Sequence, residues 1–168
     1  ADKLELTVLP LSFTINGKEH YNYLDGRDIS SSHFYRLLRE GTQCTTSAAN
    51  TNAFLSAMEP VLKKGKDILC ICFSSALSTT CASSQMAAKE LVLKYPNNKI
   101  YIVDSLSASL GQGMLTYYAV QQKQNGKTIE QVYQWMEQNK LHLCHWFTVD
   151  DLNHLKRGGR ISPAVAFV

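Results

Sequence analysis

The chain has 168 residues, of which 45% are hydrophobic, so it can bury one core and its length predicts a single domain. Its formal net charge of +3 at pH 7 is too small, and its lysines and arginines are too scattered, to indicate a nucleic-acid partner. No apolar run approaches the roughly 20 residues that span a bilayer, so no membrane span is expected. The first residues also lack the charged-then-apolar layout of a signal peptide.

The five cysteines form an odd set with no Cys-x-x-Cys pair. Cys70 and Cys72 lie two positions apart in an apolar run, so a strand would point both thiols to one face, where they act as small buried hydrophobes. In a strand, His142 and Cys144 would share a face and His145 would lie on the other, which disfavours a metal site. Reduced thiols without an export signal predict a cytoplasmic protein, and we expect no metal or cofactor.

Predicted strands and helices alternate along the chain. Strands separated by helical stretches indicate βαβ units, and therefore an α/β fold with a parallel sheet sandwiched between helices on both faces. The first part of the chain predicts an extended segment over 4–15 broken by Pro10, a turn at Asn16 and Gly17, a helix from Ser30 or Ser31 to Gly41, and a polar loop over 42–51. The middle part predicts a helix over 54–62 with a kink at Pro60, a strand over 67–73, a helix over 81–95, a strand over 99–104 and a helix over 109–124. The last part predicts a helix that starts with a capping box at Thr128 and Gln131, a strand over 141–149, and a short helix capped by Asp150 or Asp151.

The end of the chain predicts the start of one more helix. Ser162 is an expected N-cap, and Pro163 follows at the first helical position, where proline is favoured. The sequence stops at Val168, within an apolar run. We therefore expect the chain to be a fragment, or its natural continuation to have been removed.

Residues 73–80, Phe-Ser-Ser-Ala-Leu-Ser-Thr-Thr, are the most informative stretch for function. They join the carboxyl end of a predicted strand to the amino end of a predicted helix. Such a loop offers free backbone N–H groups, the positive end of the helix dipole and hydroxyl donors, and in open α/β sheets ligands bind there. Ser78, Thr79 or Thr80 would suffice as a helix cap, but the loop carries five hydroxyls. We therefore predict a site for an anionic or strongly accepting oxygen.

Several further motifs, taken in order, resemble the DegV family of bacterial fatty-acid-binding proteins. The resemblance covers essentially the whole chain. The motifs are Pro10 with Leu11, the Asn-Gly-Lys-Glu segment at 16–19, the Thr-Ser pair at Thr46 and Ser47, the Ser-Ser-x-Leu-Ser segment at 74–78, the strand ending in Asp104 and Ser105, the glycines Gly111 and Gly113, and the Asp-Leu-x-x-Leu-Lys-Arg-Gly-Gly-Arg-Ile-Ser run at 151–162.

This resemblance implies a Rossmann-like α/β fold and a two-domain protein that holds one long-chain fatty acid in a tunnel. Residues 1–168 would form the amino-terminal α/β domain, without the family's first strand and without its carboxy-terminal domain. By the same mapping, Thr46 and Ser78 bind the fatty-acid carboxylate, and Arg160 lies near the head group. The resemblance also implies a partner kinase that phosphorylates the presented carboxylate, and a binding protein with no catalytic activity of its own. One departure from the family is Thr79, where the family usually has glycine.

Two other functions are weighed against this one. An acyl-ester hydrolase would use Ser75 or Ser78 as nucleophile, but the Gly-x-Ser-x-Gly elbow is absent and no histidine is placed by sequence as its base. A small nucleotide-binding α/β module would need a third glycine after Gly111 and Gly113, where the sequence has Thr116. Both glycines also fall inside a predicted helix and not at a strand–helix turn.

Overall fold

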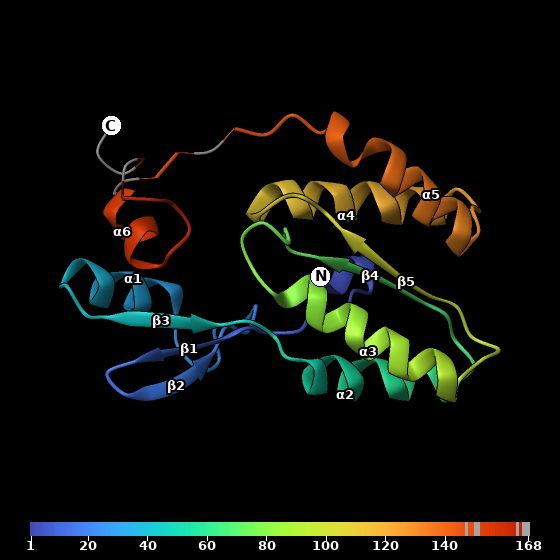
Figure 1. The fold of residues 1–168 in the computed structure, drawn as a ribbon, viewed down its shortest axis with the longest axis horizontal. Helices are drawn as coiled ribbons and strands as arrows, with labels where there is room; N and C mark the ends of the chain where they lie inside the picture. The colour runs from blue at the N-terminus through green and yellow to red at the C-terminus, as the bar shows by residue number, and fades with distance from the viewer. Residues whose placement is uncertain (147, 150–151, 164, 166–168) are drawn as a thin grey trace.

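Two separate sheets organise the chain (Figure 1). The computed structural model describes residues 1–146, 148–149, 152–163 and 165. The first sheet is antiparallel, in the order β2-β1-β3, and the second is parallel and pairs β4 with β5. The strands are β1 (Ser12–Ile15), β2 (Lys18–Tyr21), β3 (Cys44–Ser47), β4 (Ile68–Cys72) and β5 (Ile100–Asp104).

Helices cover both faces of the parallel sheet, as the sequence predicts. One face packs against α2 (Thr51–Leu62) and α3 (Thr80–Lys94), the other against α4 (Ser109–Gln124) and α5 (Ile129–Asn139) (Figure 1). Helix α3 connects β4 to the parallel strand β5, which makes a βαβ unit. The predicted α/β fold class with a parallel sheet is confirmed.

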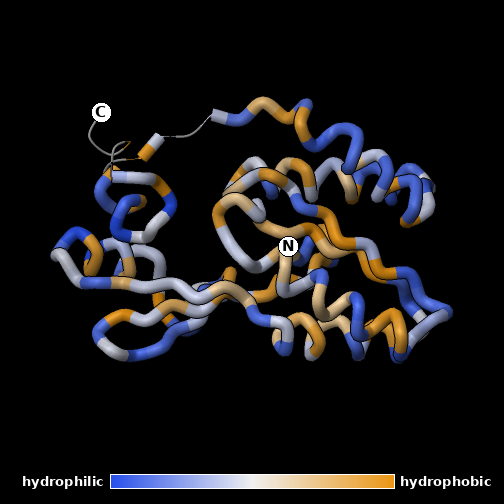
Figure 2. The backbone as a smooth tube through the Cα atoms, in the orientation of Figure 1, coloured by the Kyte–Doolittle hydropathy of each residue, from blue (hydrophilic) through white to orange (hydrophobic). Residues whose placement is uncertain are grey.

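The strands of the parallel sheet divide their side chains between two hydrophobic cores, because successive residues of a strand point to opposite faces. Cys70 and Ile102 face the core built on α2 and α3, whereas Leu69 and Val103 face the core built on α4 and α5. Figure 2 shows these strands as hydrophobic segments between helices of mixed hydropathy. The buried members are Phe54, Met58, Leu62, Ala87 and Leu91 in the first core and Val103, Leu115, Ala119, Val132 and Met136 in the second.

The hairpin of the antiparallel sheet turns where the sequence predicts. Asn16 and Gly17 have φ angles of 51° and 72°, which matches the positive φ that a two-residue hairpin turn of type I′ requires at both positions. Helix α1 (Ser31–Arg39) follows and is capped by Ser30, whose side chain accepts the His33 N–H. The ring of Phe34 packs edge-on against Phe13 at 5.0 Å between centroids, which fixes α1 to β1.

The other helices follow their sequence signals closely. Asn50 caps α2 by accepting the Ala53 N–H at 2.9 Å, and Thr128 and Gln131 form the predicted capping box of α5. Pro60 lies in the last turn of α2, and the helix continues through it to Leu62. None of the described helices is long and apolar enough to cross a membrane.

One predicted loop is a strand. Residues of the polar segment 42–51 include β3, which pairs antiparallel with β1 through Ser12 opposite Ser47 and Ile15 opposite Cys44. Three of the four β3 residues are exposed, so the strand lacks the apolar alternation that identifies strands in a sequence. In the opening segment, predicted as extended over 4–15, the strand is limited to β1, and a 3₁₀ turn, η1 (Asp2–Leu4), precedes it.

The strand predicted over 141–149 is wrong for the residues that the structure describes there. They begin in a 3₁₀ turn, η2 (Lys140–His142), and none of them pairs with a sheet. Leu143 packs against the second core instead, and His145 donates through Nδ1 to the Leu143 carbonyl at 3.1 Å. The His145 ring lies over Gly111 of α4, where a β-carbon would approach it to 3.1 Å. Of the apolar residues described in this segment, Leu143 is thus partly buried against helices, whereas Leu141 and Trp146 are exposed.

The last described segment contains a short helix, α6 (Leu152–Arg157). Its predicted caps, Asp150 and Asp151, lie outside the described residues. Ser162 accepts the Val165 N–H at 3.3 Å, the contact expected of an N-cap, and the rest of the helix predicted from Pro163 onward lies almost entirely outside the described residues.

Candidate functional site

A pocket of about 450 Å³ brings together three segments that are far apart in the sequence. The segments are the end of β3, the loop between β4 and α3, and the turn after α6, which lies above β3 in Figure 1. The lining includes all three residues singled out by the sequence: Thr46, Ser78 and Arg160. The other lining residues are Ala48, Ser75, Ala76, Leu77, Thr79, Gly158 and Gly159.

Thr46 and Ser78 approach each other from two different sheets. Thr46 belongs to β3 of the antiparallel sheet, whereas Ser78 follows β4 of the parallel sheet. The two residues therefore do not follow neighbouring strands of one sheet. The pocket therefore lies between the two sheets.

Three serines near the pocket form hydrogen bonds within and between the loops after β4 and β5. Ser74 is buried, accepts the Ala76 N–H through its Oγ at 3.3 Å, and donates its own N–H to the Ser107 carbonyl at 3.0 Å. Ser105 and Ser107 are also buried and are hydrogen-bonded to each other through side chains and backbone. These three serines hold the loops after β4 and β5 together and do not line the pocket.

Asp104, at the carboxyl end of β5, joins the same two loops. Its Oδ1 accepts the N–H of Ser75 and the N–H of Leu106, both at 3.1 Å. Burial alone would raise the pKa of this carboxyl group, but the hydrogen bonds from Ser75 and Leu106 outweigh burial and lower it. Asp104 is therefore an ionised acceptor that fixes Ser75 at the pocket.

Ser78 forms two contacts with Thr80. The two hydroxyl oxygens are 2.8 Å apart, and the Thr80 N–H donates to Ser78 Oγ at 3.2 Å. Ser78 Oγ therefore also satisfies the first N–H of α3, just before the N-cap residue Thr79, which is the purely structural role considered above. In the part of the chain that the structure describes, the N–H groups of Thr79, Cys81 and Ala82 have no partner, so the amino end of α3 offers further donors.

Two hydroxyls on the pocket are free of internal contacts. Among the described residues, neither Thr46 Oγ1 nor Thr79 Oγ1 has a hydrogen-bond partner. Thr79 has a φ of −75°, which any residue adopts, so threonine fits at this position without strain. The side chain of Thr79 instead adds a hydroxyl to the pocket lining.

Arg160 reaches the pocket on a glycine turn that ends α6. The Arg160 N–H donates to the Leu155 carbonyl at 2.9 Å, and the guanidinium donates to the Gly158 carbonyl. Gly159 has a φ of +71°, the left-handed conformation that glycine adopts at helix ends without steric cost. The turn thus places one cation at the rim of a pocket lined by hydroxyls.

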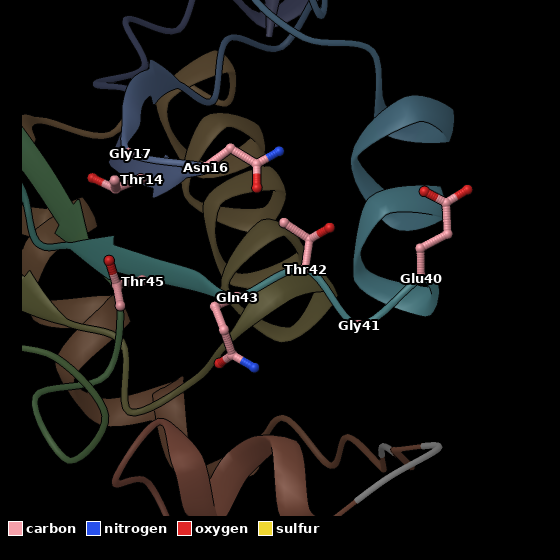
Figure 3. Close-up of a pocket in the computed structure, with 8 residues that line it drawn as sticks. All are labelled: Thr14, Asn16, Gly17, Glu40, Gly41, Thr42, Gln43 and Thr45. Atoms are coloured by element: carbon pink, nitrogen blue, oxygen red, sulfur yellow. The ribbon is translucent and has the colours of Figure 1, made fainter.

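A second pocket, of about 600 Å³, was not predicted from the sequence (Figure 3). Thr45 lines it, whereas its neighbour Thr46 lines the first pocket, because adjacent residues of β3 point to opposite faces. The side chains around it are polar and come from β1, from β3 and from the turns next to these strands, and no sequence motif marks them. They are Thr14, Asn16, Glu40, Thr42, Gln43 and Thr45, with Gly17 and Gly41.

The cysteines of β4 lie on one face, as predicted. Their sulfur atoms are 3.7 Å apart, and Cys72 Sγ is 3.1 Å from Ser84 Oγ. The contact with Cys72, to which burial adds, raises the pKa of the Cys70 thiol. Burial raises the pKa of Cys81 to about 12. In the described part of the chain, no three His, Cys, Asp or Glu side chains are grouped so that they could hold a metal ion.

Comparison with known proteins identifies the family. The family model described as an uncharacterised protein of the DegV family matches residues 1–168. The chain belongs to the DegV family. A DegV domain-containing protein of Clostridium perfringens is 47% identical over 165 residues, which cover 98% of this chain and 56% of that relative.

Solved DegV structures share the fold. The chain matches a DegV family protein from Thermus thermophilus, described for its fatty acid binding, with a TM-score of 0.83 and 29% identity over 99% of this chain and 57% of that one. It also matches the Fatty Acid Kinase (Fak) B3 protein of Streptococcus pneumoniae loaded with linoleic acid, with a TM-score of 0.80 and 18% identity over 95% and 54% of the two chains. At that identity the second match shows the fold alone. The chain spans little more than half the length of these DegV relatives.

Proposed function

We propose that this pocket binds the carboxylate of a long-chain fatty acid, with Thr46 and Ser78 as hydrogen-bond donors and Arg160 near the head group. The observation that carries the proposal is that these three residues line one pocket, beside N–H groups at the amino end of α3 that have no partner among the described residues. The fatty acid binding of the Thermus thermophilus relative, which is 29% identical, supports it.

The chemistry of the pocket suits a carboxylate. An ionised carboxylate accepts hydrogen bonds but donates none, and the pocket offers hydroxyl groups, backbone N–H groups and one guanidinium as donors. Because the amino end of α3 carries partial positive charge, the ligand does not require a buried cation.

We further propose that the protein is a binding protein that presents the acyl group to a kinase. The shared fold of the Streptococcus pneumoniae Fatty Acid Kinase B3 protein supports this partner. Because a kinase draws on cytoplasmic ATP, we place this function in the cytoplasm. Of the two rival functions, the hydrolase lacks a histidine among the pocket-lining residues. The nucleotide module would need its glycines at a strand–helix turn, but Gly111 and Gly113 lie inside α4.

A single hydroxyl deletion tests the proposal in the full-length protein that carries this sequence. Ser78→Ala should weaken fatty-acid binding by about 1.5–3 kcal/mol, the range for a hydrogen bond to a charged group, which is roughly tenfold to a hundredfold in Kd. The free energy of unfolding should fall by no more than the ~1 kcal/mol of a helix cap. Titration with a long-chain fatty acid and urea denaturation measure the two quantities.

A matched pair of variants on β3 provides the control. Thr46→Val should weaken binding, whereas Thr45→Val removes an equivalent hydroxyl from the opposite face of the same strand and should leave Kd unchanged. If Ser78→Ala lowers stability but leaves Kd unchanged, Ser78 is only a helix cap and the carboxylate site is wrong.

A further inference from the structure

Thr80 makes two contacts with Ser78 Oγ. Its hydroxyl oxygen lies 2.8 Å away, and its backbone N–H donates at 3.2 Å. Thr80 itself is half-buried in the first turn of α3 and does not line the pocket. Thr80 can therefore affect a ligand in the pocket through its contacts with Ser78.

The two hydroxyls can share their hydrogen bond in either direction. If Ser78 donates to Thr80, the pocket faces the remaining lone pair of Ser78 Oγ, which repels an anion. If Thr80 donates to Ser78, both acceptor positions of Ser78 Oγ are filled, one by the Thr80 hydroxyl and one by the Thr80 N–H. The proton of Ser78 is then its remaining polar group, and it is free to point into the pocket.

We propose that Thr80 is a positioning residue, whose hydroxyl donates to Ser78 Oγ and directs the Ser78 proton toward the bound carboxylate. This inference rests on the proposed function of the pocket. Two donors on one oxygen also polarise its O–H bond, which makes Ser78 a stronger donor. The fixed rotamer lowers the entropy lost when Ser78 orders around the ligand.

Two substitutions at position 80 separate the hydroxyl from the shape of the side chain. Thr80→Val keeps the branched shape and the backbone N–H but removes the hydroxyl, and it should raise Kd for a long-chain fatty acid about threefold to tenfold, as for a neutral hydrogen bond. Thr80→Ser keeps the hydroxyl and should bind as the unchanged protein does. If Ser78 is the donor instead, Thr80→Val frees its proton, and Kd stays the same or falls.

A double-mutant cycle with Ser78→Ala shows whether Thr80 acts through Ser78. In the Ser78→Ala protein, adding Thr80→Val should leave Kd unchanged. An equal loss in both backgrounds would mean that Thr80 only supports the loop, and the inference would fail. If Ser78→Ala weakens binding and Thr80→Val does not, the inference fails and the carboxylate site stands. If Ser78→Ala has no effect on Kd, both fail. Should Thr80→Val not fold, Thr80→Ala serves in the same cycle.

Discussion

The hydroxyl side chains near the pocket have two kinds of surroundings. Ser74, Ser105 and Ser107 are buried and hydrogen-bonded within their loops. The hydroxyls of Thr46 and Thr79 line the pocket and have no hydrogen-bond partner in the described part of the chain. A buried hydroxyl without a hydrogen-bond partner costs free energy, so the first group is held in place by its bonds within the folded protein and needs no ligand. The second group is available to a ligand, so the chemistry of the pocket depends on these two hydroxyls.

Gly159 is the residue on which the position of Arg160 depends most directly. Gly159→Ala would place a β-carbon on a backbone with φ +71°, at a cost of about 1–2 kcal/mol, so the turn should rearrange and move Arg160 from the pocket. We expect Kd for a fatty acid to rise toward the value of the Arg160→Ala variant, as measured by titration.

Gly158→Ala is the control, because the neighbours of its β-carbon begin at 3.5 Å, an ordinary contact distance, and its φ lies outside the left-handed region. Similar losses of affinity in both variants would show that the turn conformation at Gly159 does not determine the site.

Among the elements, the parallel pair of β4 and β5 does most to position the loop of Ser78. Parallel strands bring their carboxyl ends to the same edge of a sheet, so the loops after β4 and β5 lie side by side. Asp104 then bonds one N–H from each loop, and the Ser74 N–H bonds the Ser107 carbonyl. The loop that carries Ser78 is therefore fixed from the neighbouring strand as well as from its own helix.

Removing the carboxylate of Asp104 should loosen both loops together. Asp104→Ala leaves the N–H groups of Ser75 and Leu106 without their acceptor, and we expect the free energy of unfolding to fall by about 1.5–3 kcal/mol, as measured by urea denaturation. Asp104→Asn retains one acceptor oxygen and should cost less. A loss as large for Asn as for Ala would mean that the charge, and not the acceptor position, stabilises the loops.

The sequence predicted the elements that depend on residues close together in the chain. It failed for segments whose structure depends on a distant strand or helix beside them. Asn50, Thr128 and the Asn16–Gly17 turn act through neighbours a few residues away, so their residue types identify them. β3 is a strand because β1 lies beside it, and its exposed threonines give no apolar pattern. Leu143 has the sequence pattern of a strand residue but is partly buried against helices. The meeting of Thr46 and Ser78 was predicted by family resemblance, and their approach from two sheets was not.

On the scale of the whole molecule, the unit around the parallel sheet and the unit around the antiparallel sheet each have hydrogen bonds and ion pairs that join their own elements. Glu59 of α2 pairs with Lys94 of α3 and accepts the Tyr95 hydroxyl at 2.9 Å, which joins the two helices on one face of the parallel sheet. In the antiparallel unit, Asp28 accepts the Tyr21 N–H at 2.7 Å and bonds His20 Nδ1 at 2.8 Å. These bonds link the loop before α1 to β2.

The Asp28 contacts predict how stability depends on pH. Hydrogen bonds from the Tyr21 N–H, and then from His20, lower the pKa of Asp28 below its ordinary value of 3.8. The stabilisation is therefore complete above pH 3.8 and is lost as the pH falls through the lower value of the folded state. Asp28→Asn should lower the melting temperature at pH 7, and its difference from the unchanged protein should vanish in acid.

Asp25→Asn is the matched control, because Asp25 pairs with Arg27 on the surface, where both side chains are more than half exposed. Exposed ion pairs contribute little, so its effect at pH 7 should be smaller. A difference between Asp28→Asn and the unchanged protein that persists at low pH would show that Asp28 stabilises through its shape and not through its charge.

The walls of the Thr46–Ser78–Arg160 pocket come from three segments spread over most of the chain, so no short stretch can build it. Closing so long a loop costs entropy, and the pocket exists only when both sheets and the turn after α6 have docked. A ligand held there bridges parts that share no single core. At a free concentration of a hundred times its Kd, such a ligand would stabilise the folded chain by about 2.7 kcal/mol. The ligand would stabilise the contacts between the two sheets more than either core, so it would act as a removable part of the fold.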